Sequence, residues 1–145
     1  MTTARFDTSG LQDVLDEMTR LGETTGPVAE EMILVGAEEV RKAWDRSARE
    51  HGYYEGGGKY ATGDMINAIG YPRKPTCIGA ALEIDIYPQG KNRRGRRNAE
   101  VAFVLHYGTS KMKGSRWVDD TDRYSGETVV PAMQEIWDDF IKQKG

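Results

Sequence analysis

Two short segments of this 145-residue chain have residue types and spacings that could act on phosphate or acyl groups. The run Gly-Gly-Gly-Lys at 56–59 is similar to a phosphate-binding loop. Such a loop also needs a glycine five residues before its last glycine and Ser or Thr after its lysine, whereas Tyr53 and Tyr60 stand at those positions. Ser110 and Lys113 have the Ser-x-x-Lys spacing of serine acyl-transfer enzymes, which need further partner motifs and a larger scaffold. We therefore expect a flexible glycine loop and no acyl-transfer site.

Side chains that could bind a metal or transfer a proton are few and scattered. Asp119, Asp120 and Asp122 suggest calcium binding, but no glycine or distal glutamate completes a calcium loop around them. His51 and His106 fall on different expected elements and lack the His-x-x-x-His spacing of a metal site. We expect no catalytic residue, no metal and no cofactor, and hence a protein that is not an enzyme.

The main concentration of charge is a basic cluster in a chain whose net charge is −3. The cations are Lys91, Arg93, Arg94, Arg96 and Arg97. Cations that neutralise phosphates release counterions, so this cluster could bind duplex DNA without sequence preference. A single nearby aromatic residue makes a stacking platform for single strands unexpected. A solvated loop and a contact with an acidic protein surface are the open alternatives.

Composition limits the class of protein. With 38% apolar and 30% charged residues, the chain has enough apolar surface to offset the entropy of folding. The single Cys77 excludes an intrachain disulfide and a multi-cysteine zinc site. No apolar run approaches the ~18 residues of a membrane helix, and residues 1–7 lack the apolar stretch of a secretory signal. We expect one soluble domain over 1–145, made inside the cell and without a membrane partner.

Apolar spacing predicts three helices in the first half of the chain. Residues 11–21 have helical periodicity behind the capping box formed by Ser9 and Gln12. Pro27 begins an amphipathic helix that continues to about residue 50. Residues 62–69 predict a short helix capped by its threonine, with one apolar face made by Met65, Ile66 and Ile69.

The pattern then changes period. Strict alternation over 82–87 predicts a strand with one buried face, which residues 76–80 could extend. The nearly continuous apolar run over 99–107 predicts a second strand covered on both faces. The basic segment between them, 88–98, is then the exposed tip of a long hairpin.

The C-terminal part predicts a polar loop followed by one helix. Residues 109–126 are polar apart from Trp117, and 128–144 carry an amphipathic pattern with Pro131 in the first turn. The fold class is therefore α+β: an antiparallel β-hairpin or sheet with a long basic loop, packed against a long N-terminal helix and a C-terminal amphipathic helix.

Three blocks of the chain together resemble one family. Residues 62–69 resemble its Thr-Gly-x-Leu-x-x-Ser-Ile segment, and 104–112, Val-Leu-His-Tyr-Gly-Thr-Ser-Lys-Met, resemble an aromatic-rich strand ending in Gly-Thr-Ser-Lys. The opening block at 6–11 and the final amphipathic helix fit in kind and order. The family is the small tail-component proteins of tailed double-stranded DNA bacteriophages, called head–tail connector, neck or tail-completion proteins. The chain departs from it over 113–120, where Trp117 and Val118 replace a compact proline-containing segment.

The resemblance implies a structural virion protein of the phage neck or upper tail. Such a subunit forms a ring, with a hexamer as the natural expectation, around the DNA channel and joins the tail to the head-side connector. Its implied partners are further copies, other head–tail connector proteins, tail terminator or tail tube proteins, and lumenal double-stranded DNA. Its implied location is the virion, after assembly in the bacterial cytoplasm. A tail assembly factor absent from the virion and a small non-specific DNA-binding module are the alternatives.

The resemblance also indicates which residues make these contacts. The basic cluster at 91–97 would contact DNA or an acidic partner. The contacts with subunits or partners are expected at His106, Tyr107, Gly108, Thr109, Ser110, Lys111 and Trp117.

Overall fold

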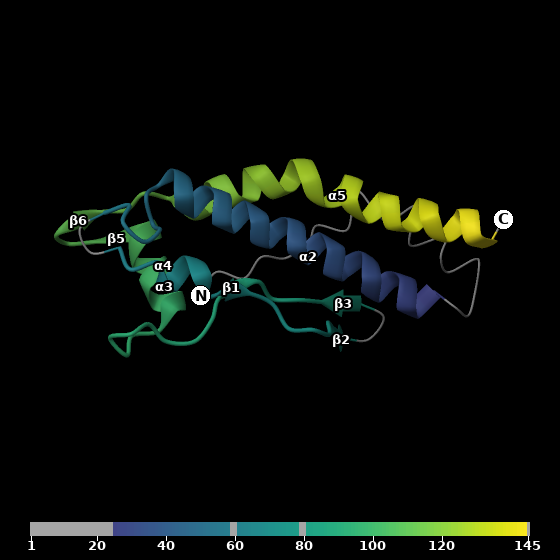
Figure 1. Cartoon of the computed structure of the whole chain (residues 1–145), viewed down its shortest axis with the longest axis horizontal. Coiled ribbons are helices and arrows are strands. Elements are labelled where there is room, and N and C mark those ends of the chain that lie inside the picture. The colour runs from purple at the N-terminus through teal and green to yellow at the C-terminus, as the bar shows by residue number, and fades with distance from the viewer. Residues whose placement is uncertain (1–24, 59–60, 79–80, 145) are drawn as a thin grey trace.

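The computed structural model describes residues 25–58, 61–78 and 81–144. The expected helix over 11–21, its capping box and the block at 6–11 lie outside these ranges. Two long helices, α2 (Thr25–Glu50) and α5 (Trp117–Lys144), lie side by side and run in opposite directions (Figure 1). Within the described ranges, two short helices and three small antiparallel strand pairs complete an α+β fold.

Helix α2 confirms the prediction for 27–50, beginning two residues earlier. Its buried stripe includes Met32, Val40 and Trp44, which are 2%, 3% and 1% exposed. This face packs against α5, and ion pairs such as Arg49–Asp45 lie on the outer surface. The helix ends before Gly52, whose φ of 81° is accessible to glycine without strain. Amphipathic spacing therefore predicted this element correctly.

Helix α5 corrects the prediction of a polar loop over 109–126, because the helix begins at Trp117 rather than near 128. The first turns lack a hydrophobic pattern because two inward positions carry polar residues. Thr121 is buried and Ser125 is half-buried, and both lie on the inward stripe that continues at Val129. Asp119 and Asp120 lie in the first turn, where their negative charges interact favourably with the positive end of the helix dipole and stabilise the helix. Pro131 consequently lies inside the helix and not in its first turn.

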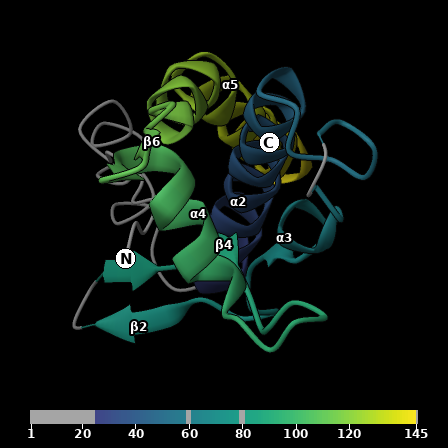
Figure 2. The same cartoon turned by 90° about the vertical axis from the view of Figure 1, so that its left-hand side faces the viewer.

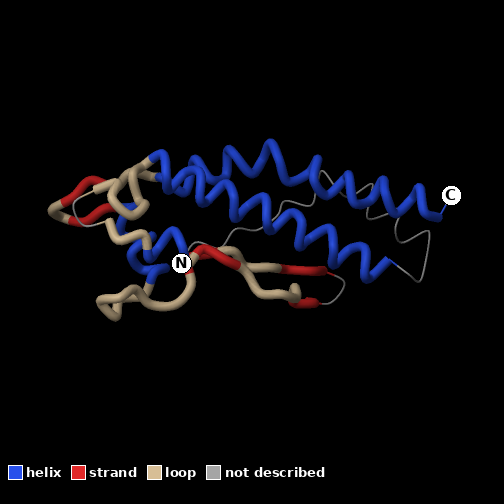
Figure 3. The backbone as a smooth tube through the Cα atoms, in the orientation of Figure 1, coloured by secondary structure: helices blue, strands red, loops and turns tan. Residues whose placement is uncertain are grey.

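The strands are short and paired locally (Figure 3). β1 (Ile69–Gly70) pairs with β4 (Tyr87–Pro88), β2 (Thr76–Ile78) with β3 (Ala81–Glu83), and β5 (Gly108–Thr109) with β6 (Met112–Lys113), all antiparallel. The alternation predicted for 82–87 is present, since Ile84 and Ile86 are buried and Asp85 is exposed. Only the two ends of that segment form ladders. Residues 76–78 do not extend that strand, because they form β2 and pair with β3, while 79–80 lie outside the described residues.

The short helix predicted at 62–69 is α3 (Asp64–Asn67). The helix is shorter than predicted, and its N-cap is Gly63, with a φ of 83°, so the predicted cap by Thr62 is wrong. The Thr62 hydroxyl still accepts a hydrogen bond from the Asp64 backbone N–H at 3.3 Å. Met65, Ile66 and Ile69 are buried, as their spacing predicted.

The prediction of a second strand over 99–107 is wrong, because this segment is helix α4 (Asn98–Tyr107). A short continuous apolar run fits a buried strand and a buried helix equally well. Here the buried residues are Asn98, Ala102 and His106, one every fourth position, which is helical spacing. No long hairpin therefore joins 82–87 to 99–107, and the basic segment is a loop that leads from β4 into α4.

The core is centred where α2, α4 and α5 meet. The Trp44 and Trp117 rings pack edge to face with centroids 5.1 Å apart, and Tyr53 packs on Trp117 in the same way at 5.7 Å. The Trp117 indole N–H donates to the Ala102 carbonyl at 3.2 Å, which ties α5 to α4. Within the described ranges, no helix combines the length and the apolar character needed to cross a bilayer.

Candidate interaction surface at one end of the helical pair

Helix α4 connects the two segments that the sequence singled out. The basic loop, residues 91–97, precedes its first turn, and the β5–β6 hairpin, residues 108–113, follows its last turn. Both segments lie at the same end of the long helices, with α4 running between them across that end (Figures 1 and 2). We call the basic loop, the outward side of α4 and the β5–β6 hairpin together the end surface.

The basic loop has a defined conformation. The Asn92 side-chain oxygen accepts hydrogen bonds from the backbone N–H groups of Arg94 and Arg96, both at 3.0 Å. A single antiparallel bridge joins Lys91 to Arg97 at the base of the loop. The Asn98 side chain then donates to the Gln89 carbonyl at 2.8 Å and holds the loop against the start of α4. The cations are therefore displayed by a folded turn.

Two of the five cations in this loop are engaged within the chain. Arg93 forms a two-pronged ion pair with Asp64, with Nε–Oδ2 and Nη2–Oδ1 distances of 3.0 and 2.8 Å. The Arg93 side chain and backbone N–H together lower the pKa of Asp64 to about 2. Arg96 lies 3.5 Å from Glu100. Among the described residues, nothing forms an ion pair with the exposed side chains of Lys91, Arg94 or Arg97.

The outward side of α4 exposes aromatic side chains. Phe103 and Tyr107 are 47% and 55% exposed, and their ring centroids lie 4.7 Å apart. Met112 in β6 is 43% exposed, and the Arg116 guanidinium lies 5.6 Å from the centre of the Tyr107 ring. Large apolar side chains grouped in this way commonly mark a surface that binds another protein.

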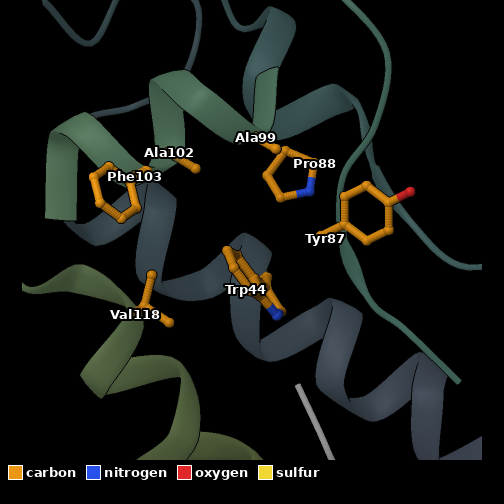
Figure 4. A pocket seen from close by; sticks show the side chains of 7 residues that line it. All are labelled: Trp44, Tyr87, Pro88, Ala99, Ala102, Phe103 and Val118. Atoms are coloured by element: carbon orange, nitrogen blue, oxygen red, sulfur yellow. The ribbon is translucent and has the colours of Figure 1, made fainter. Parts of the chain in front are cut away.

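The inward side of α4 faces Trp44 of α2 and the start of α5. Figure 4 shows a small pocket there, with Trp44 on the α2 side, Ala102 on the α4 side and Val118 from α5. Phe103 and Tyr87 lie at its two edges, and the Tyr87 hydroxyl points away from it. The residues that line the pocket offer apolar surface and no acid–base pair, so the pocket does not resemble a catalytic site.

Two residues expected at a partner interface are buried instead, which corrects their assignment. Trp117 is 0% exposed and belongs to the core. His106 is 4% exposed, and its Nδ1 accepts a hydrogen bond from the Val118 backbone N–H at 3.3 Å. Burial lowers the pKa of His106, because the charged ring would lose its hydration. Both residues join α4 to the start of α5.

The other expected contact residues lie on the β5–β6 hairpin or beside it. Tyr107, Thr109, Ser110 and Lys111 are exposed. Gly108 has a structural role: its φ is 83°, and a Cβ there would collide with the backbone of Gly114. The glycine of the Gly-Thr-Ser-Lys segment therefore permits the turn at the end of α4, while the next three residues are available to a partner.

Sequence reasoning missed Phe103, Met112 and Arg116 as members of this surface. The sequence did contain a signal for it, because Phe103 and Tyr107 are four residues apart and therefore lie one turn apart on the same face of a helix. Treating the segment as a strand covered on both faces concealed it.

The residues considered for chemistry are not assembled into a reactive site. Ser110 and Lys113 are both exposed on the hairpin, and Asp119 and Asp120 form the first turn of α5. His51 pairs with Asp120 at 3.0 Å and stacks on Tyr53. Over residues 25–58, 61–78 and 81–144, no group of three or more His, Cys, Asp or Glu side chains is arranged to bind a metal ion.

The chain matches no protein-family model, no curated protein and no solved structure.

Proposed function

We propose that the protein is a structural subunit of the neck or upper tail of a tailed double-stranded DNA bacteriophage. In this role, copies form a ring around the DNA channel and join the tail to the head-side connector. The observation that carries the proposal is the end surface. Its two segments, 91–97 and 108–113, lie at the two ends of α4, which exposes Phe103 and Tyr107 between them (Figure 2). The sequence resemblance over 62–69 and 104–112 supplies the choice of particle.

The remainder of the fold is suited to carry such a surface. Helix α5 has 28 residues and is about 42 Å long at 1.5 Å per residue, and α2 packs along it. Short loops on a rigid helical scaffold are a common location for binding residues. A ring also requires two different contact surfaces on each copy, and the end surface supplies one of them.

The proposal is tested by deleting the gene from the phage and complementing it from a plasmid. We expect electron microscopy of the deletion lysate to show filled heads and tails that are not joined, and complementation to restore joined, infectious particles. Joined and infectious particles in the deletion lysate would contradict the proposal. Missing tails beside normal heads, with the protein absent from complemented particles, would indicate the tail assembly factor instead.

A further inference from the structure

The chain carries a second surface whose chemistry complements the end surface. An open groove of about 510 Å³ lies along the N-terminal half of α2 and beside Tyr71. Leu34, Val35 and Tyr71 give it apolar surface, and the carboxylates of Glu30 and Glu31 lie on the same stretch. The groove is wide open to solvent, so side chains of a partner can reach its apolar lining. We call it the acidic groove.

The charge of the acidic groove is largely uncompensated. Glu38 is engaged, because it accepts hydrogen bonds from Arg41 at 2.7 Å and from the Tyr71 hydroxyl at 2.8 Å. Within the part of the chain that the structure describes, Glu30 and Glu31 have no ion-pair partner. Other acidic residues are exposed on α5, among them Glu127 and Glu135, but they do not line this apolar hollow.

The end surface offers the opposite combination. Its cations Lys91, Arg94 and Arg97 have no ion-pair partner among the residues that the structure describes. The exposed rings of Phe103 and Tyr107 follow them along α4. Aromatic side chains that enter an apolar hollow, with cations facing carboxylates at its edge, are the usual combination of a buried centre and a charged rim at an interface.

The two surfaces are placed so that one copy cannot use both by itself. The end surface lies where α2 ends, whereas the groove follows the first half of α2, toward the opposite end of the long helices (Figure 1). A contact between two different patches repeats from copy to copy and closes into a ring when the rotation permits.

We infer that the end surface of one copy docks into the acidic groove of the next copy, so that the protein associates head to tail. The inference rests on the proposed function, since it identifies the subunit contact of the proposed ring. The occupant of the groove is a second copy of this chain, because charge and apolar surface match on both sides.

The test is a charge exchange in the purified full-length chain, followed by sedimentation velocity at low salt. One variant carries Arg94→Glu and Arg97→Glu, and the other carries Glu30→Lys and Glu31→Lys. We expect the wild type to form oligomers and each variant alone to associate at least about tenfold more weakly. We expect a mixture of the two variants to recover the oligomers, because each reversed end surface then meets a reversed groove.

Matched controls separate the contact from general charge and folding effects. Glu127→Lys with Glu135→Lys makes the same charge change on exposed positions of α5 and should leave association unchanged. Phe103→Ser should weaken association, whereas Val130→Ser, at a residue 37% exposed on α5, should not. Circular dichroism of each variant verifies that it is folded.

Three results would overturn the inference. One is a wild-type chain that stays monomeric at all concentrations, and another is association that stops at two copies or that the mixture fails to restore. The third is that the wild type binds duplex DNA, with a log–log salt slope of about 2.7 in magnitude for three phosphate contacts. In that case Arg94→Glu and Arg97→Glu would abolish the DNA binding and leave self-association intact. The deletion phenotype is read on particles, so a failure of the groove contact and a failure of the proposed function are distinguishable.

Discussion

The Arg93 guanidinium and the Asp64 carboxylate form a two-pronged ion pair that fastens the basic loop to the first turn of α3. The Arg93 backbone N–H adds a third hydrogen bond to the same carboxylate at 2.9 Å. One of the five cations that the sequence grouped together is thus used to hold the loop in place. The charge that faces outward belongs mainly to its neighbours Lys91, Arg94 and Arg97.

Replacing Arg93 should release the Asp64 carboxyl. In Arg93→Gln we expect the pKa of Asp64 to rise from about 2 toward the ordinary value of 3.8, since the guanidinium is the main cause of the lowering. Carbon-detected NMR titration of the aspartate carboxyls measures it. Arg94→Gln removes a cation from the same loop and should leave the Asp64 pKa near 2. An unchanged Asp64 pKa in Arg93→Gln would mean that the ion pair does not form in solution.

The core position of Trp117 has a large expected effect on stability. Trp117→Ala should lower the free energy of unfolding by about 3–5 kcal/mol, because it leaves a cavity against Trp44 and removes the hydrogen bond to Ala102. Urea denaturation followed by tryptophan fluorescence measures the loss. Tyr107→Ala, at an exposed aromatic position of α4, is the control and should change stability little. A Trp117→Ala chain as stable as the wild type would remove this residue from the core.

Buried His106 should make the stability fall on mild acidification. Its pKa is lowered in the folded chain, so the unfolded chain binds a proton first as the pH falls. The stabilisation is therefore complete above the ordinary pKa of about 6.5 and is lost progressively below it, down to the folded pKa. Protonation would also break the bond that Nδ1 accepts from the Val118 N–H.

Thermal unfolding measured between pH 8 and pH 5 tests this sign. Asp119 and Asp122 attract the protonated ring and Arg116 repels it, so these charges tune the response. The wild-type midpoint should fall over this range more than that of His106→Gln, whose side chain does not titrate. Equal pH profiles for the two chains would show that His106 is not the responsible group.

Two glycines should respond in opposite directions to the same substitution. Gly126→Ala should raise the free energy of unfolding by about 0.5–1 kcal/mol, because Gly126 lies inside α5 and a Cβ there meets open space. Gly108→Ala should lower the free energy of unfolding by about 1–3 kcal/mol, because the φ of 83° and the backbone of Gly114 exclude a side chain. Urea denaturation of both variants gives the comparison. A stabilised Gly108→Ala chain would contradict the turn described at the end of α4.

The helices with a clear amphipathic pattern could be predicted from sequence, and those hidden by local composition could not. Helix α2 has one apolar stripe and a glycine stop, and α3 has the apolar residues Met65 and Ile66, which are buried as predicted. The predicted threonine cap of α3 is replaced by Gly63 at the N-cap. Helix α5 was found only from about residue 128, because Thr121 and Ser125 occupy inward positions that a hydrophobic pattern does not detect. The buried state of Thr121 depends on packing against distant residues and has no local signal.

The candidate surface was predicted in part. Its basic and hairpin segments were both identified from composition and from the family resemblance. Their meeting at one end could not be foreseen, because it depends on 98–107 being the helix that joins them. The same helix turns His106 inward and Phe103 outward, and its Ala102 carbonyl binds the buried Trp117 of α5, so His106 and Trp117 do not have the interface roles expected of them.

Quantitative mass spectrometry of purified particles of the phage that encodes this chain is the most direct test of the proposed function. The proposal predicts that the protein is present in a fixed copy number, near six or twelve per particle, relative to the tail tube and head-side connector proteins. Complete and infectious particles that lack this chain would contradict the assignment to the neck or upper tail.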